Sequence, residues 1–305
     1  MQNLDQLQQI HNRQQYEDMK SLNKVLIIGL GQLGLPVARY VNEKGFDTYG
    51  YDISHQAIEQ AEKTAGVKRA INFSEFDAYI LCVSTHKSDD IFTPQIDGLL
   101  SIVERISQEA KNGALVSIES TIPKGTSKKV LEILRHRLHV VHAPHRWHAL
   151  EQKEHGVNQL RVIGGVFNCC LKAGMQLYGG VDSFNLTDQT LSKSSSPSLG
   201  VTMHPVSEVE IAEITKIVEN AHRYLQIAFA EELYLYCQEN SMSFSELRDA
   251  LNTKWNVKIL EPREGIGGHC LPKDTRMFLQ SSASKSKILS AAMEVDIDYR
   301  RCMGN

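Results

Sequence analysis

The feature that most constrains the fold of this chain is the segment KVLIIGLGQLGLPVARYV near its start. Residues 24–28 form a short, largely apolar run that is typical of a buried strand. Glycines at positions 29, 31 and 34 follow, and residues 33–42 then carry the pattern of a helix. A strand, a Gly-x-Gly-x-x-Gly turn and a helix, in this order, predict the first unit of a doubly wound α/β domain.

This turn also predicts a dinucleotide site. Glycine permits the tight turn and lets the backbone approach a pyrophosphate, which then sits at the helix N-terminus. Asp52 ends the next predicted strand. A carboxylate there accepts hydrogen bonds from ribose hydroxyls and repels a 2′-phosphate, which favours NAD over NADP. The predicted cofactor residues of this region are Gly29, Gly31, Gln32, Leu33, Gly34 and Asp52.

The rest of the chain divides by its hydrophobic pattern. Further apolar runs, separated by helical patterns, predict a parallel sheet covered on both faces. After about residue 180 a Ser-rich stretch reads as loop, and three- and four-residue apolar spacing then predicts a long helix. We expect strands at 47–51, 78–83, 114–118, 138–142 and 160–163. We expect an N-terminal arm (1–22, with a short amphipathic helix), a Rossmann-type domain (23–182), a Ser-rich insert or linker (183–205) and an all-α domain (206–305).

Composition excludes several classes of protein. The 305 residues contain 33 Lys and Arg against 36 Asp and Glu, a net charge of −3, which argues against a broadly basic nucleic-acid binder. No apolar run approaches the length of a membrane span, and the polar first twenty residues resemble no signal peptide. The six cysteines show no C-x-x-C spacing, so we expect reduced thiols in a cytoplasmic protein.

Two places in the second half carry side chains suited to catalysis. Lys216 and Asn220 lie four residues apart on one helix face, where the lysine either pairs with a neighbouring glutamate, Glu213 or Glu219, or stabilises an alkoxide. The segment GIGGHCLPKD places Cys270 in a Gly-rich and, we expect, irregular loop beside cationic residues that favour a thiolate. From the residues alone Cys270 is either a nucleophile or an ordinary thiol, and Asp274 either reacts or caps the next helix.

Taken together, these motifs resemble the nucleotide-sugar dehydrogenases, the UDP-glucose/GDP-mannose dehydrogenase family, and among them the UDP-N-acetylmannosamine type. The likeness covers about residues 24–300. It rests on GLGQLGLPVA, on CVST (82–85), on IESTIPKGTS (118–127), on the helix AEITKIVENAHRYLQIAFAEE (212–232) and on GIGGHCLPKD (265–274).

The resemblance implies a four-electron oxidation that uses two NAD per sugar and serves polysaccharide biosynthesis. A primary alcohol becomes an aldehyde, which adds to Cys270 as a thiohemiacetal; a second hydride transfer gives a thioester, and water releases the uronic acid. In that scheme Lys216 stabilises oxyanions, Asn220 and Thr121 position water and substrate, and Asp274 assists proton removal. Val83, Thr85 and Thr121 join the cofactor residues, and the helical domain forms a homodimer.

The chain departs from the family at several points, three of which bear most on its chemistry. His145 stands where the family has the glutamate that serves thioester hydrolysis, so the histidine either activates the water or hydrolysis is lost. Glu231 stands where the family usually has asparagine. The chain stops at Asn305, before the C-terminal domain that grips the nucleotide in the family, which leaves truncation, a separate chain or true absence open.

These departures keep two other functions open: a two-electron β-hydroxyacid-type dehydrogenase that uses Lys216 and Asn220 alone, and a non-catalytic NAD-binding protein. A metal site is also conceivable, because histidines recur every third residue. The repeat crosses a predicted helix, strand and loop, so we expect these side chains not to converge and predict no metal. The histidines are His136, His139, His142, His145 and His148.

Overall fold

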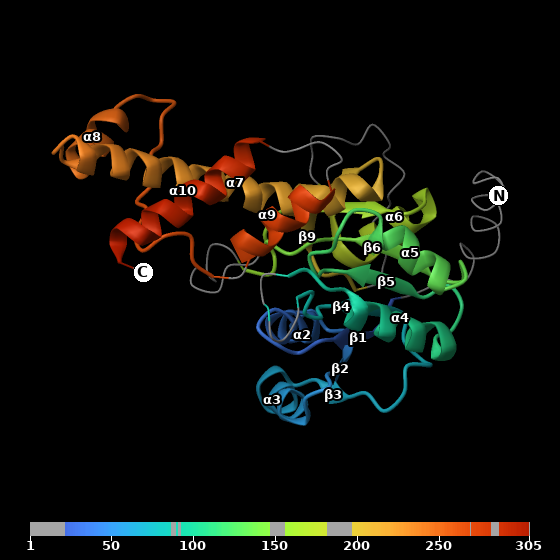
Figure 1. The fold of residues 1–305 in the computed structure, drawn as a ribbon. Helices are drawn as coiled ribbons and strands as arrows, with labels where there is room; N and C mark the ends of the chain where they lie inside the picture. The colour runs from blue at the N-terminus through green and yellow to red at the C-terminus, as the bar shows by residue number, and fades with distance from the viewer. Residues whose placement is uncertain are drawn as a thin grey trace. The chain divides into compact units, whose positions relative to one another are not determined.

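The computed structural model describes residues 22–86, 90, 93–146, 156–181, 197–268, 270–281 and 287–304. The chain forms two compact units, described separately below: Met1–Thr85 with Gln95–Lys216, and His86–Pro94 with Ile217–Asn305. Figure 1 shows the strands gathered in the first unit and long helices in the second. The expected N-terminal helix and most of the Ser-rich insert lie outside the described residues.

The first unit is built on one sheet, with strand order β3-β2-β1-β4-β5-β6-β7-β9-β8 among the described residues. Two of its central strands, Ala78–Leu81 and Leu115–Ile118, are largely apolar and buried along their whole length, as expected of a parallel sheet covered on both faces. The strands are β1 (Lys24–Ile28), β2 (Asp47–Tyr51), β3 (Lys68–Arg69), β4 (Ala78–Leu81), β5 (Leu115–Ile118), β6 (His139–His142), β7 (Arg161–Gly165), β8 (Gly179–Val181) and β9 (Val201–Val206).

Helices cover the sheet. The chain steps one way from β1 to β2 and the other way from β4 to β5, so right-handed crossovers place the connecting helices on opposite faces. Accordingly α2 packs with α3, and α4 packs with α5. This reversal between β1 and β4 is the point at which doubly wound sheets bind ligands, beyond the carboxyl ends of the strands. The helices are α2 (Gly34–Glu43), α3 (His55–Ala65), α4 (Asp97–Glu109), α5 (Thr126–Ile133) and α6 (Asn168–Tyr178).

The Rossmann-type α/β prediction is confirmed, with two corrections. The sheet is not wholly parallel, because β7 runs antiparallel to β6, with Val141 opposite Gly165. A strand's side-chain period is the same in either direction, so the sequence pattern could not show this. The expectation of a loop or linker over 183–205 is also wrong at its end, because residues 201–205 belong to β9, which pairs with β7 and β8. Its short VTMHPV pattern follows a Ser-rich stretch and contains a proline, which favoured loop.

The second unit is helical. It contains most of α7 (Val209–Glu239), together with α8 (Phe244–Leu251), α9 (Cys270–Ser281) and α10 (Lys287–Met303). Ser243 begins α8 by accepting a hydrogen bond from the Glu246 N–H at 3.3 Å, an ordinary N-cap. The apolar clusters of the second unit are much smaller than the apolar core around the sheet. One of them groups Tyr224 and Ala228 of α7 with Ala292 of α10.

Two global features of the described residues bear on the expectations above. None of their helices combines the length and apolar character needed to cross a membrane. All six cysteines are free thiols; Cys270 and Cys302 are exposed, and the other four are buried.

Candidate active site

The glycine turn is shaped so that only glycine fits at two of its positions. Gly29 has φ +89°, and a Cβ there would lie 2.6 Å from the Cys82 carbonyl oxygen. A Cβ on Gly34 would lie 1.7 Å from the Gly29 carbonyl oxygen, because the start of α2 presses against the end of β1. At Gly31 a Cβ would meet nothing within 4 Å, and Gln32 beside it is exposed. The turn thus leaves an open cradle at the N-terminus of α2.

Asp52 closes one side of this cradle. Its carboxylate accepts hydrogen bonds from the Leu30 N–H at 2.7 Å and the Ser54 N–H at 2.8 Å. These bonds fix the negative charge at the carboxyl end of β2, next to the glycine turn. Leu33 occupies the N-cap position of α2, and its side chain makes no capping hydrogen bond to the first N–H groups of that helix. This arrangement fits a dinucleotide whose pyrophosphate meets the helix and whose ribose meets Asp52.

Three further predicted cofactor residues follow the ends of β4 and β5. Val83 and Thr85 come after β4, and Thr121 comes after β5. The two segments are joined because the Ser120 hydroxyl donates to the Val83 carbonyl at 2.6 Å. Since β1, β4 and β5 are neighbours, these residues share the sheet edge of the glycine turn.

A buried charge network lies at the same edge. Glu119, at 1% exposure, pairs with the equally buried Arg161, whose Nη1 lies 2.9 Å from its carboxylate. The Tyr178 hydroxyl donates to Glu119 at 2.7 Å and lies 2.7 Å from the Ser117 hydroxyl. Burial, and next the Glu119 charge, raise the pKa of Tyr178 well above its ordinary value, so the phenol stays protonated as a donor.

His145 belongs to this network. Its Nε2 lies 3.6 Å from a Glu119 carboxylate oxygen, and its backbone N–H donates to the Glu119 carbonyl at 3.3 Å. Burial, helped by the positive charges of Arg161 and Lys216, holds the pKa of His145 well below its usual range. The imidazole is therefore neutral at pH 7, and its lowered pKa makes it a weaker base than an ordinary histidine.

The start of α7 is fixed to the loop after Thr121. The Glu213 carboxylate accepts hydrogen bonds from the Gly125 N–H at 2.6 Å and the Ser127 N–H at 2.7 Å. Burial raises the pKa of Glu213, although these N–H groups oppose the shift. Glu213, one of the two glutamates considered as partners of Lys216, thus binds the backbone of the loop after Thr121. Lys216 follows it by three residues, on the same side of the helix.

In the second unit, Asn220 of α7 meets Asp274 of α9. The Asn220 side-chain amide donates to the Asp274 carboxylate at 2.5 Å, and Lys273 Nζ lies 3.5 Å from the other carboxylate oxygen. Asp274 lies inside α9, so of its two alternatives the helix cap is wrong. Cys270 is the exposed first residue of α9, and not part of an irregular loop as expected. Cys270 is therefore the first residue of the same helix whose Asp274 accepts the hydrogen bond from Asn220.

The structure thus groups the predicted residues into three sets. The glycine turn, Asp52 and the ends of β4 and β5 form one; His145 with its charge network forms the second. Both lie in the first unit, as does Lys216. Asn220, Asp274 and Cys270 form the third, in the second unit. Sequence reasoning missed two members of these sets, namely Glu119 and Arg161. Glu119 directly precedes the Ser120-Thr121 motif, which was the available signal.

A Rossmann sheet with this glycine turn and acid defines a dinucleotide-binding protein, and comparison with known proteins identifies the family. The model of the UDP-glucose/GDP-mannose dehydrogenase family NAD-binding domain matches residues 62–182, and that of its central domain matches residues 210–297. The chain belongs to the UDP-glucose/GDP-mannose dehydrogenase family.

Relatives include two UDP-N-acetyl-D-mannosamine dehydrogenases. That of Methanococcus maripaludis is 30% identical over 90% of this chain and 65% of its own length, and that of Campylobacter jejuni is 27% identical over 91% and 72%. The solved UDP-D-ManNAc dehydrogenase of Pyrococcus horikoshii superposes with a TM-score of 0.74 at 26% identity, over 90% of this chain and 68% of that one. The chain thus spans about two thirds of the length of these relatives.

Proposed function

We propose that this protein is an NAD-dependent dehydrogenase that oxidises the primary alcohol of a nucleotide sugar to the uronic acid, through intermediates bound covalently to Cys270. The contact that supports this most is the hydrogen bond between Asn220 and Asp274. It joins the helix of the predicted Lys and Asn to the helix that begins at the cysteine, as a shared catalytic role requires.

The cofactor would be held by the cradle of the first unit. The backbone of Gly29, Gly31, Gln32, Leu33 and Gly34 would bind the pyrophosphate, Asp52 the ribose, and Val83, Thr85 and Thr121 would line the nicotinamide side. The close approaches at Gly29 and Gly34 and the open space at Gly31 fit this role. When bound, NAD supplies the acceptor for the hydride lost at each oxidation.

The chain's own residues manage the protons and the covalent step. At the first oxidation Lys216 stabilises the alkoxide while Asp274 assists removal of the hydroxyl proton. The Cys270 sulfur then bonds to the aldehyde carbon, and the carbonyl oxygen takes up a proton to give a thiohemiacetal. Loss of that proton and of a second hydride leaves a thioester on Cys270, with Asn220 and Thr121 positioning water and substrate.

Release of the acid requires a base for water. Neutral His145 takes this role in place of the family's glutamate. Because its pKa is lowered, the Glu119 carboxylate 3.6 Å away has to offset the charge of the imidazolium as it forms. Water adds to the thioester carbon, its proton passes to His145, and the C–S bond breaks to restore the thiol. Glu119 acts here as a positioning residue.

The substrate and assembly follow from the relatives. Their names make UDP-N-acetylmannosamine the first substrate to test. We further propose a homodimer through the helical unit, where Phe229 and Tyr236 of α7 are 52% and 51% exposed. The thiol chemistry needs a reduced cysteine, which suits the cytoplasm. Light scattering at micromolar concentration that gives the mass of a single chain would contradict the dimer.

The test is the amount of NADH formed, followed at 340 nm, from a limiting amount of UDP-N-acetylmannosamine, UDP-glucose or GDP-mannose. Two NADH per sugar support the proposal. One NADH per sugar favours the two-electron dehydrogenase or a stalled thioester. No NADH from any sugar, in protein that binds NAD, favours the non-catalytic NAD-binding protein.

A further inference from the structure

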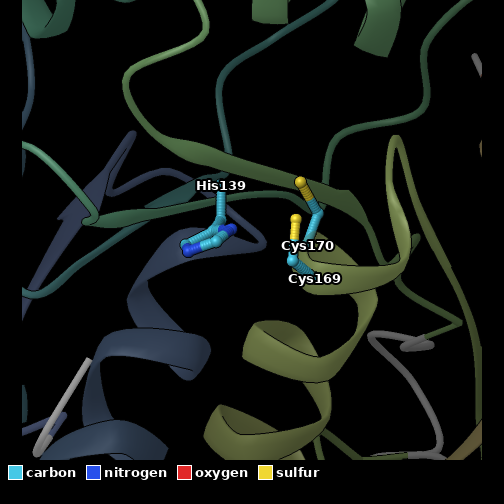
Figure 2. A group of neighbouring side chains, drawn as sticks. All are labelled: His139, Cys169 and Cys170. Atoms are coloured by element: carbon cyan, nitrogen blue, oxygen red, sulfur yellow. The ribbon is translucent and has the colours of Figure 1, made fainter. Parts of the chain in front are cut away.

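A histidine and two cysteines meet in the first unit, away from the cradle. His139 is the first residue of β6, and Cys169 and Cys170 lie in the first turn of α6. One donor atom from each residue lies within 4.8 Å of the other two. Figure 2 shows the imidazole and the two thiols next to one another at the start of α6. All three are buried, at 1%, 5% and 0% exposure.

The cluster lies at the opposite edge of the sheet from the cofactor cradle. His139 is at the amino end of β6, whereas the glycine turn follows the carboxyl end of β1. The antiparallel run of β7 brings α6 to this edge, because the Val166 N–H bonds to the Val140 carbonyl at 3.1 Å and α6 begins two residues later. The three side chains therefore have no part in the proposed reaction.

The position of the two cysteines is fixed by close packing. A Cβ on Gly165, at the end of β7, would lie 2.3 Å from the Leu171 backbone nitrogen. The first turn of α6 thus sits directly against the strand, and neither cysteine can move away without moving that turn. Binding at this place would need little reorganisation of the donors.

The donor set selects one kind of ion. Two thiolates and an imidazole suit zinc, whereas magnesium and calcium require oxygen ligands. Zn–S distances of about 2.3 Å and Zn–N distances of about 2.0 Å would bring the donors to about 3.5–3.8 Å from one another, a small contraction. Two thiolates with neutral histidine cancel the charge of Zn²⁺, while Cu⁺ would leave a buried negative charge. Charge balance thus favours the divalent ion in so buried a place.

We propose that His139, Cys169 and Cys170 bind one zinc ion that ties the first turn of α6 to the amino end of β6. The Zn–N bond and two Zn–S bonds form as the two thiols give up their protons to solvent, with no change in oxidation state. Because the site is buried, we expect the ion to enter as the protein folds and to add to its stability.

The test is the zinc content of the reduced, full-length chain, refolded with Zn²⁺ and then dialysed against a weak chelator. We expect about one zinc per chain in the wild type and less than about a tenth of that in a Cys169→Ser/Cys170→Ser double variant. Cys237→Ala, a buried lone cysteine, and Cys270→Ser, the exposed one, are controls that should keep the zinc. NAD binding, which needs no turnover, reports whether each variant has folded.

A second readout needs no variant. Replacement of zinc by Co²⁺ should give a thiolate-to-cobalt charge-transfer band in the near ultraviolet, and a strong chelator should lower the melting temperature of the wild type. Equal zinc in the wild type and the double variant, a Cys169–Cys170 disulfide in the reduced protein, or a cobalt complex without that band would each overturn the proposal.

Discussion

Glu119 of the first unit and Glu231 of the second are both almost completely buried, and the charged groups nearest to them differ in sign. Glu119 of the first unit faces the Arg161 guanidinium and the Tyr178 hydroxyl. Glu231 of the second unit faces the Asp296 carboxylate. Burial, and next the Asp296 charge, raise the pKa of Glu231 to about 8, although Arg300 opposes the shift. The two buried glutamates thus differ in the sign of the nearest charged group, which adds to the effect of burial at Glu231.

The contrast assigns the two residues different purposes. The Glu119 carboxylate pairs with a buried guanidinium and lies 3.6 Å from the His145 ring. A protonated Glu231 stores no charge at neutral pH, and its ionisation would place two carboxylates side by side. The raised pKa of Glu231 thus makes the second unit sensitive to alkaline pH.

The largest expected effect on stability comes from substitution of Glu119. Glu119→Gln keeps the shape but leaves Arg161 buried without its countercharge, so we expect a loss of about 3–5 kcal/mol in the free energy of unfolding. Urea denaturation measures this. Glu75→Gln is the matched control, because Glu75 pairs with Lys24 at the surface, where an ion pair contributes little to stability. Equal losses in the two variants would contradict the account of the network.

The second prediction concerns Glu231, where the substitution by glutamine should stabilise the protein instead of destabilising it. The pKa of Glu231 in the folded protein is about 8, against an ordinary value of 4.5, so between these pH values the folded state holds a proton that the unfolded chain has lost. Stability from this group is full below pH 4.5 and is lost as pH rises toward 8. Glu231→Gln should therefore change little at pH 5 and should stabilise the protein on the order of 2–4 kcal/mol at pH 8.5. Urea denaturation at both pH values decides; destabilisation at pH 8.5 would contradict the assignment.

A smaller effect should appear at acidic pH in the first unit. Burial lowers the pKa of His142 to about 3, so the unfolded chain takes up a proton below pH 6.5 that the folded state refuses. Stability is present above pH 6.5 and falls as pH drops toward 3. His142→Gln should remove this slope, a difference of about 1–2 kcal/mol between pH 7 and pH 5. Thermal unfolding across that range measures it, and an unchanged slope in the variant would count against it.

The sequence predicted most of the first unit because buried strands are continuous apolar runs and the glycine turn needs its own residues. It could not predict contacts between distant segments. The pairing of Glu119 with Arg161 depends on the reversed direction of β7, which leaves no mark on the side-chain period. The histidine repeat likewise did not predict which side chains meet. His139 lies beside two cysteines from another element, and no other histidine joins that group among the described residues. In the second unit the motif located Cys270 but not the start of α9.

The measurement that tests the central claim most directly is the uronic acid formed by wild type and by Cys270→Ser from the same limiting nucleotide sugar, quantified by mass spectrometry. Cys302→Ser, the other exposed cysteine of the second unit, serves as the matched control. The account predicts acid from wild type and Cys302→Ser, and a loss of about a thousandfold or more in Cys270→Ser with NAD binding intact. Acid formed by Cys270→Ser at the wild-type rate would contradict it.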